Sequence, residues 1–220
     1  MKIFLDNYFK ANTWIVFWVM IFIYFISITI ELKYIFTDSF YFEVFDHKKS
    51  IFNIQDFIKK ERTYDWLNYL AAFIVVLLPS LIVAFILNIG VIFYEYKVKF
   101  RYLFVIVLKS QIIFAINYII STMLKWQGVI ERNYGNINNN YDYQSLRCFF
   151  NNKELAFWLN FPLEKINITE FIYILFLSYG FALISNKNYM KCLGFVLIFY
   201  GLALIGWIIF TVFIQTLLYN

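Results

Sequence analysis

Charged residues are scarce in this sequence of 220 residues: Asp, Glu, Lys and Arg together make up 15%, against about 25% in a typical soluble domain. None lies between Asp65 and Glu95, and none follows Lys191. Each of these stretches exceeds the roughly 20 residues with which an α-helix crosses the hydrocarbon core of a bilayer. The shortage of charge therefore predicts a protein that folds in a membrane rather than in water.

Proline, glycine, cysteine and histidine are also scarce, and each shortage excludes something. Two prolines and seven glycines favour plain helices over re-entrant glycine-rich loops. Cys148 and Cys192 lack the spacing of a zinc or redox site, and His47, between Asp46 and Lys48, has the setting of a solvated loop residue. No P-loop, HExxH or GxSxG motif is present. We therefore predict no catalytic residue, cofactor or metal site, and no enzymatic activity.

Basic residues exceed acidic ones by 19 to 14, which gives a formal net charge of +5. In a soluble domain this excess would suggest a nucleic-acid partner. In a chain that is 62% apolar, it is better explained by the lysine and arginine bias that orients membrane helices. The expected partner is the lipid bilayer, and no nucleic acid is expected.

Five apolar segments predict an all-α fold: a polytopic integral membrane helical bundle that forms a single transmembrane domain over residues 1–220. The five transmembrane helices are expected at residues 13–30, 67–94, 102–124, 166–186 and 192–218. Pro79 leaves open whether the second helix is continuous or broken. The first segment is predicted to be a retained helix and not a cleavable signal peptide, because Glu31 stands where a small-residue cleavage site would be needed.

The basic residues also predict an orientation. Three basic groups fall on one face of a five-helix chain: Lys2 and Lys10; Lys97, Lys99 and Arg101; Lys187 and Lys191. Because basic residues near helix ends favour the cytoplasmic side, we expect a cytoplasmic N-terminus and an extracytoplasmic C-terminus at the cell (inner) membrane. Cys148 is then outside and Cys192 at the inner boundary, so the two cannot pair.

Two longer loops, residues 31–66 and 125–165, are expected on the extracytoplasmic side. Three isoleucines at helical spacing within residues 51–66 predict an amphipathic helix that lies on the membrane surface. In the second loop, a polar spacer over residues 133–143 precedes an apolar stretch. Both loops are predicted to cap the bundle.

Polar residues gather on one broad face of the third helix. They form two adjacent stripes within this face, one of Ser110, Asn117 and Ser121 and one of Gln111, Tyr118 and Thr122. In lipid, such a face must turn toward other helices or toward a wet cavity. Two interpretations stay open: a polar pathway or binding groove at mid-membrane, or hydrogen bonds that join helices, with Asn88 and Gln215 as candidate partners.

Lys109 lies on the same helix, about 12 Å from the inner boundary at Arg101. A charge inside a membrane costs on the order of 3 kcal/mol, which makes Lys109 a candidate functional residue. Its side chain points back toward the inner surface, so it could also reach water by snorkelling. The acids that border a helix are poor partners for Lys109, because Glu31 and Glu170 are expected at the outer surface and Glu95 at the inner one. No acid is expected to pair with a base inside a helix.

The fifth helix carries Gly194, Gly201 and Gly206 in its charge-free stretch. Gly194 and Gly201 are seven positions apart and share a face, which would let another helix approach closely. No GxxxG motif is present, so the glycines predict helix packing and no activity.

Two stretches resemble a bacterial family. KVKFRYLFVIVLKSQIIF (residues 97–114) and AFWLNFPLEKINITEFIY (residues 156–173) are similar to five-helix inner-membrane proteins of the Bacteroidetes group, whose activity is not established. In those proteins a pattern precedes the fourth helix, made of Trp-Leu, then Pro-Leu, then Asn and Glu. In this sequence the pattern reads WLNFPLEKINITE. Their Lys-Ala-Glu in the third helix corresponds to Lys109-Ser110-Gln111, which lacks the acid. The topology also resembles the Yip1 fold.

The first functional hypothesis is a non-enzymatic integral membrane protein, an accessory or assembly subunit of an inner-membrane complex. Its protein partner, or a second copy of the chain, would contact the polar face of the third helix or the aromatic outer loops. The alternative is a small oligomeric transporter or channel whose pathway follows Ser110, Asn117 and Ser121 near Lys109. A third hypothesis is an intramembrane enzyme that acts on a lipid-linked substrate.

Overall fold

The computed structural model describes residues 2–45, 51–130, 141–150 and 157–219. His47 and its neighbours, and most of the polar spacer over residues 133–143, lie outside these ranges. Within them every regular element is helical, and the only strand-like pairing is an isolated bridge between Ser145 and Asn167. The all-α fold class is therefore confirmed.

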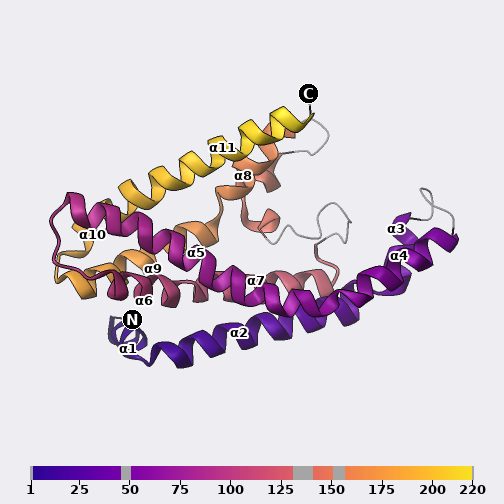
Figure 1. Ribbon diagram of the computed structural model, residues 1–220, viewed down its shortest axis with the longest axis horizontal. Coiled ribbons are helices and arrows are strands. Elements are labelled where there is room, and N and C mark those ends of the chain that lie inside the picture. Colours follow the sequence, from indigo (N-terminus) through magenta and orange to yellow (C-terminus); the bar gives the residue numbers. More distant parts are fainter. Residues whose placement is uncertain (1, 46–50, 131–140, 151–156, 220) are drawn as a thin grey trace. The chain divides into compact units, whose positions relative to one another are not determined.

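The helices follow one another along the chain as shown in Figure 1. Their bounds are α1 Lys2–Lys10, α2 Thr13–Ile30, η1 Glu31–Ile35, α3 Asp38–Phe45, α4 Ile51–Thr63, α5 Asp65–Phe93, α6 Phe100–Ser110, α7 Ile112–Trp126, η3 Asp142–Gln144, η4 Leu146–Phe149, η5 Phe157–Leu159, α8 Asn160–Lys165, α9 Ile168–Ser185, α10 Tyr189–Val196, η6 Leu197–Gly201 and α11 Leu202–Tyr219.

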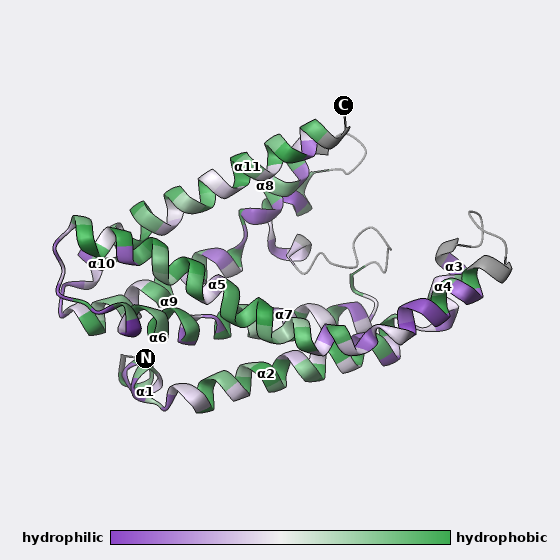
Figure 2. Ribbon diagram, viewed as in Figure 1, coloured by the Kyte–Doolittle hydropathy of each residue, from purple (hydrophilic) through white to green (hydrophobic). Residues whose placement is uncertain are grey.

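Five helical spans in the described residues are long and apolar enough to cross a membrane, as predicted. They are Thr13–Ile35, Asp65–Phe93, Phe100–Trp126, Ile168–Ser185 and Tyr189–Leu217. Hydrophobic residues cover them along their length, whereas α4 is largely hydrophilic (Figure 2). The chain is a helical membrane protein.

The second span is a single helix, α5, which continues through Pro79. The alternative of a break at this proline is wrong. Proline removes one backbone hydrogen bond from a helix, and transmembrane helices tolerate this loss where neighbouring groups satisfy the freed carbonyl.

Three spans depart from plain α-helix, which the sequence did not predict. A π-helical turn, η1, carries the first span past its expected end at Ile30, so that Glu31 lies inside the span. Gln111 separates α6 from α7, and its N–H is shared between the carbonyls of Val107 and Leu108, both at 3.2 Å. A second π-helical segment, η6, lies in the fifth span.

Contacts divide the chain into two compact units. The first comprises Met1–Phe17, Leu77–Phe114 and Tyr141–Asn220, and the second Trp18–Val76 and Ala115–Asn140. The expectation of one transmembrane domain over residues 1–220 stays a prediction. Each unit has its own apolar contacts. Two of the polar groupings described below lie in the first unit and one lies in the second.

The first unit is built around α9, which packs against α6 and α10. Fully buried Leu103, Tyr173, Leu177 and Phe181 belong to its core, and the rings of Phe181 and Phe195 stack with centroids 4.5 Å apart. Aromatic side chains, plentiful in the sequence, thus fill this core.

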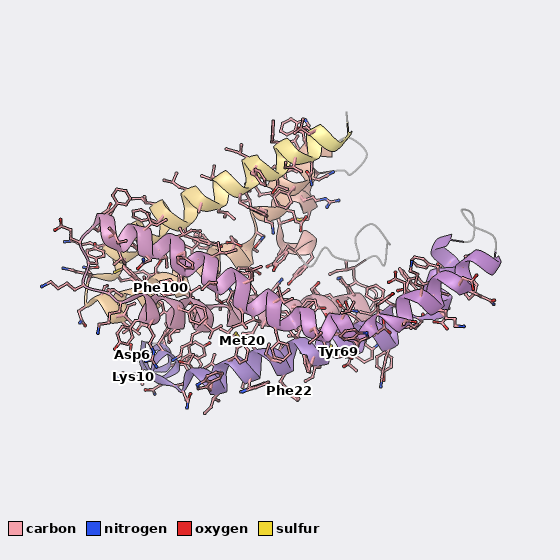
Figure 3. All side chains as sticks on the ribbon, in the orientation of Figure 1. Asp6, Lys10, Met20, Phe22, Tyr69 and Phe100 are labelled. Carbon is pink, nitrogen blue, oxygen red and sulfur yellow. The ribbon has the colours of Figure 1, made fainter. Side chains whose placement is uncertain are left out.

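In the second unit, one face of α2 is buried and the other is exposed: Met20 is fully buried, whereas Phe22 is 65% exposed (Figure 3). Phe25 packs edge-on against Tyr69 of α5 with ring centroids 5.2 Å apart. The amphipathic helix predicted within residues 51–66 is present as α4, and its Ile54 and Ile58 are buried in a small cluster with α3.

Candidate functional site

Lys109, at the end of α6, makes its contacts inside the protein. Its side chain is buried, and its ammonium donates hydrogen bonds of 2.7 Å to the carbonyls of Phe9 and Ala11. These oxygens belong to the C-terminal end of α1, where helix carbonyls lack partners within the helix and where the helix dipole attracts a positive charge. Lys109 therefore caps α1.

Two further hydrogen bonds attach α1 to the same unit. The Tyr8 hydroxyl donates to the Lys109 carbonyl at 2.7 Å, and burial raises the pKa of Tyr8, which keeps this donor protonated. The Tyr179 hydroxyl of α9 donates to Asp6 at 2.7 Å. Figure 1 shows α1 beside α6 and α9. The short α1 is thus held to two transmembrane helices by polar contacts.

A second grouping lies in the other unit, between η1 and α7. Glu31 accepts a hydrogen bond of 2.6 Å from the Tyr118 hydroxyl and one of 3.2 Å from Thr122. The ammonium of Lys125 lies 3.7 Å from the same carboxylate. Glu31 and Lys125 are 9% and 3% exposed, so this ion pair is buried.

The local sequence explains how α7 builds this grouping. Tyr118, Thr122 and Lys125 are spaced i, i+4 and i+7, which places all three on one helix face. The π-helical turn extends the first helix far enough to bring Glu31 to them. The ring of Tyr24 packs against Tyr118 with centroids 5.2 Å apart. In this arrangement the carboxylate receives two hydroxyl donors and one countercharge from a single neighbouring helix.

This pairing corrects the expectation that no acid would pair with a base inside a helix. The expected position of Glu31 at the outer surface of the membrane stays a prediction. The sequence carried a usable signal: the stripe of Tyr118 and Thr122 continues to Lys125, and Glu31 directly follows an apolar run. A buried ion pair gains little net stability, but the loss of one partner is costly.

The remaining residues of the predicted polar face are mostly buried. Ser110, Gln111, Asn117, Ser121 and Thr122 are buried, and Tyr118 is half-buried. Ser110 donates to the Ile106 carbonyl of its own helix at 2.8 Å, a bond that satisfies a hydroxyl without another helix. Whether this face serves a function stays a prediction.

Neither proposed partner of that face is seen to join it. Asn88 is half-buried on α5, and no hydrogen bond from it to the third span is present in the described residues. The side-chain oxygen Oε1 of Gln215 is buried and has no hydrogen-bond partner there. In the third span, Lys109 finds its partners in α1, Tyr118 and Thr122 find theirs in η1, and Ser110 bonds to its own helix backbone.

A third grouping surrounds Glu170 in the first turn of α9. Asn167 caps this helix by accepting a 2.7 Å hydrogen bond from the Glu170 N–H. Glu170 Oε1 accepts a hydrogen bond from the hydroxyl of Tyr200, on η6. Glu170 is buried, with 9% of the residue exposed, and its expected position at the outer surface of the membrane stays a prediction. Sequence reasoning missed the contact with Tyr200, which lies 30 residues away.

No group of three or more His, Cys, Asp or Glu side chains gathers in the part of the chain that the structure describes. The candidate site residues are therefore single carboxylates and lysines held by tyrosine, threonine and main-chain oxygen. Such groups can carry charge, bind a proton or join helices.

No protein-family model, curated protein or solved structure matches the chain. The resemblance to inner-membrane proteins of the Bacteroidetes group therefore stays an expectation.

Proposed function

We propose that the chain is a non-enzymatic accessory or assembly subunit of a bacterial inner-membrane complex, with its N-terminus in the cytoplasm. It contributes no chemistry of its own. Its part is to fold stably in the bilayer and to present one transmembrane helix, α11, to a protein partner.

The use of its polar groups favours this proposal over a transport pathway. A pathway needs polar side chains that are free to contact the transported species. Lys109 is instead occupied by two carbonyls of α1, Ser110 by its own helix, and Tyr118 by Glu31. The contacts of Lys109 and Tyr118 join different helices, as do the bonds that hold membrane helices together.

The observation that carries the proposal is the sparse packing of the fifth span. In the most apolar 18-residue stretch of this span, only 6% of the residues are buried within the chain. In the other four spans the corresponding share is 33 to 50%. Within its unit, α11 continues directly from η6 and packs mainly against α8 and η5. Large apolar side chains along it are exposed: Leu202, Ile205, Trp207, Ile209, Phe210, Phe213 and Leu217.

Gly206 lies in this exposed helix, and a Cβ atom added there would meet nothing within 4 Å. A glycine in open space contributes nothing to the packing of this chain, but it allows a second helix to approach closely in the membrane. We therefore place the partner's transmembrane helix against α11, in place of the polar face of the third helix.

The test is purification from the native host in mild detergent, followed by mass spectrometry of the co-eluting proteins. We expect a stoichiometric partner with the wild-type chain. Gly206→Leu should lose it, because the added side chain blocks close approach without disturbing the fold. Ile74→Phe, at a 59% exposed position of α5, adds bulk elsewhere and should keep the partner.

Other outcomes would change the proposal in definite ways. Equal recovery of the partner with Gly206→Leu would exclude α11 as the contact surface. A chain that elutes alone as a homo-oligomer would favour the transporter alternative, since five helices leave little room for a pathway in one copy. Flux measured with Asn117→Ala, which alters a buried polar residue of α7, would then be the next test.

A further inference from the structure

The two buried carboxylates of the spans, Glu31 and Glu170, differ in the neighbouring groups that balance their charge. Glu31 has Lys125 at 3.7 Å together with two hydroxyl donors. Glu170 has one hydroxyl donor, Tyr200. Among the described residues, no lysine or arginine nitrogen lies within 4.0 Å of a Glu170 carboxylate oxygen. Both carboxyl groups are 9% exposed, so burial alone does not distinguish them.

The surroundings of Glu170 are otherwise phenolic. Tyr173 lies one turn further along α9 and on the same face, and its ring meets that of Tyr200 edge-on at 5.4 Å. The Tyr173 hydroxyl is fully buried and has no hydrogen-bond partner among the described residues. A buried hydroxyl without a partner is unusual, because its desolvation costs about 1–3 kcal/mol.

The charged group that acts on this carboxyl does so from a distance. Lys165 of α8 attracts Glu170, but its ammonium lies over the rings of Tyr141 and Phe161, 5.6 and 5.3 Å from their centroids. Tyr141 in turn interacts electrostatically with Tyr200. The titratable groups that act on Glu170 are thus the phenols of Tyr200 and Tyr173 and one remote lysine, Lys165.

We propose that Glu170 is a proton-binding site, a carboxyl group that holds a proton at neutral pH in the folded protein. A carboxylate in this apolar setting would be a buried charge with one hydroxyl donor and no ion pair, which is more costly than a neutral acid. The proton comes from water, forms an O–H bond on Oε2 and returns to water on release.

A metal cation would need more ligands than this site offers. Sodium, like calcium and magnesium, is held by several oxygen ligands, whereas among the described residues the side-chain hydroxyl bonded to the Glu170 carboxyl group is that of Tyr200 alone. That hydroxyl donates its proton to the carboxyl group. A proton needs only the single carboxyl oxygen that Tyr200 leaves open.

The test is infrared difference spectroscopy of the full chain in lipid nanodiscs at pH 7, which detects the carbonyl stretch of a protonated carboxyl group. Exposed Asp and Glu side chains are ionised at this pH, so they do not contribute. We expect one such band in the wild type, its complete loss in Glu170→Gln, and its retention in Glu31→Gln. The glutamine at position 170 can still accept the hydrogen bond from Tyr200.

Tyr200→Phe provides a second readout that leaves Glu170 in place, and it should shift the frequency of the band because the hydrogen bond to the carboxyl is lost. Absence of the band at pH 7, or its survival in Glu170→Gln, would overturn the proposal. A band that appears only when sodium and potassium are replaced by choline would also overturn it, and would identify a bound metal cation instead.

Discussion

At the scale of single residues, the buried side chains of Lys109 and Glu31 find their partners within the chain, because hydrocarbon offers none. Lys109 uses the carbonyls at the end of α1, and Glu31 uses three side chains of α7. Each arrangement predicts the effect of a substitution that removes its hydrogen bonds or its ion pair.

Lys109→Met should release α1. The substitution removes two charge-assisted hydrogen bonds, each worth about 1.5–3 kcal/mol, and leaves the carbonyls of Phe9 and Ala11 unsatisfied. We expect backbone amides of α1 to exchange with deuterium at least about tenfold faster, since 1.4 kcal/mol corresponds to a factor of ten. Hydrogen exchange measured by mass spectrometry in detergent checks this.

The matched control for that experiment is Lys10→Met, which removes an exposed lysine from α1 itself. It should leave the exchange of α1 unchanged. If Lys109→Met also left the exchange unchanged while abolishing the activity of the complex, then Lys109 would have a direct functional role and would not merely cap α1.

The pair of Glu31 and Lys125 should show strong coupling in a double-mutant cycle. Glu31→Gln or Lys125→Met alone leaves a buried charge without its partner, which costs about 3–5 kcal/mol of unfolding free energy in comparable sites. The double substitution removes both charges and should cost clearly less than the sum of the two. Unfolding by SDS titration in mixed micelles measures all four free energies.

The exposed pair of Arg62 and Asp38, 3.1 Å apart with Asp38 65% exposed, is the comparison. Its coupling should be about 0–1 kcal/mol, as for surface ion pairs in general. Coupling of equal size in both pairs would mean that the Glu31 grouping is wet and not buried as described.

At the scale of helices, the glycines of the fifth and second spans have opposite surroundings. A Cβ atom on Gly90 of α5 would lie 2.5 Å from Phe199 and 2.7 Å from Phe195, whereas one on Gly206 would meet nothing within 4 Å. Gly90→Ala should therefore lower the unfolding free energy by about 1–3 kcal/mol through overpacking, and Gly206→Ala should not lower it. Thermal unfolding in detergent distinguishes the two.

The helices themselves could be predicted because lipid imposes a simple rule: each crossing needs about 20 apolar residues. The second span was expected at residues 67–94 and is found at Asp65–Phe93. The end of the first span was not predictable in the same way. The turn after Ile30 continues as a π-helix while Glu31 meets Tyr118, and that contact joins residues 87 positions apart.

The groupings around the carboxylates were missed for the same reason. Spacing along one helix shows which side chains share a face, but not which other helix they meet. The sequence did hold partial signals: Lys125 continues the stripe of α7, and Asn167 followed by Glu170 is the pattern of a helix N-cap with an acid in the first turn. The contribution of Tyr200, from a π-helical segment of another span, had no local signal.

At the scale of the whole molecule, the orientation in the membrane is the prediction on which every loop assignment depends. Cys148 is exposed and is expected outside. Cys192 is expected at the inner boundary, but it is 1% exposed. A buried thiol reacts poorly on either side of a membrane, so its failure to react would not report its location.

A better inner reporter is Met190→Cys, at a neighbouring position that is 70% exposed, in a chain that also carries Cys192→Ser. In intact cells a membrane-impermeant maleimide should label Cys148, and the thiol introduced at position 190 should react only after the cells are permeabilised. The exposed basic residues Lys97, Lys99 and Arg101 should then lie in the cytoplasm, as their density near helix ends predicts. Labelling of position 190 in intact cells, with protection of Cys148, would show that the topology is the inverse of the one predicted. The proton of Glu170 would then exchange with the cytoplasm and not with the outside.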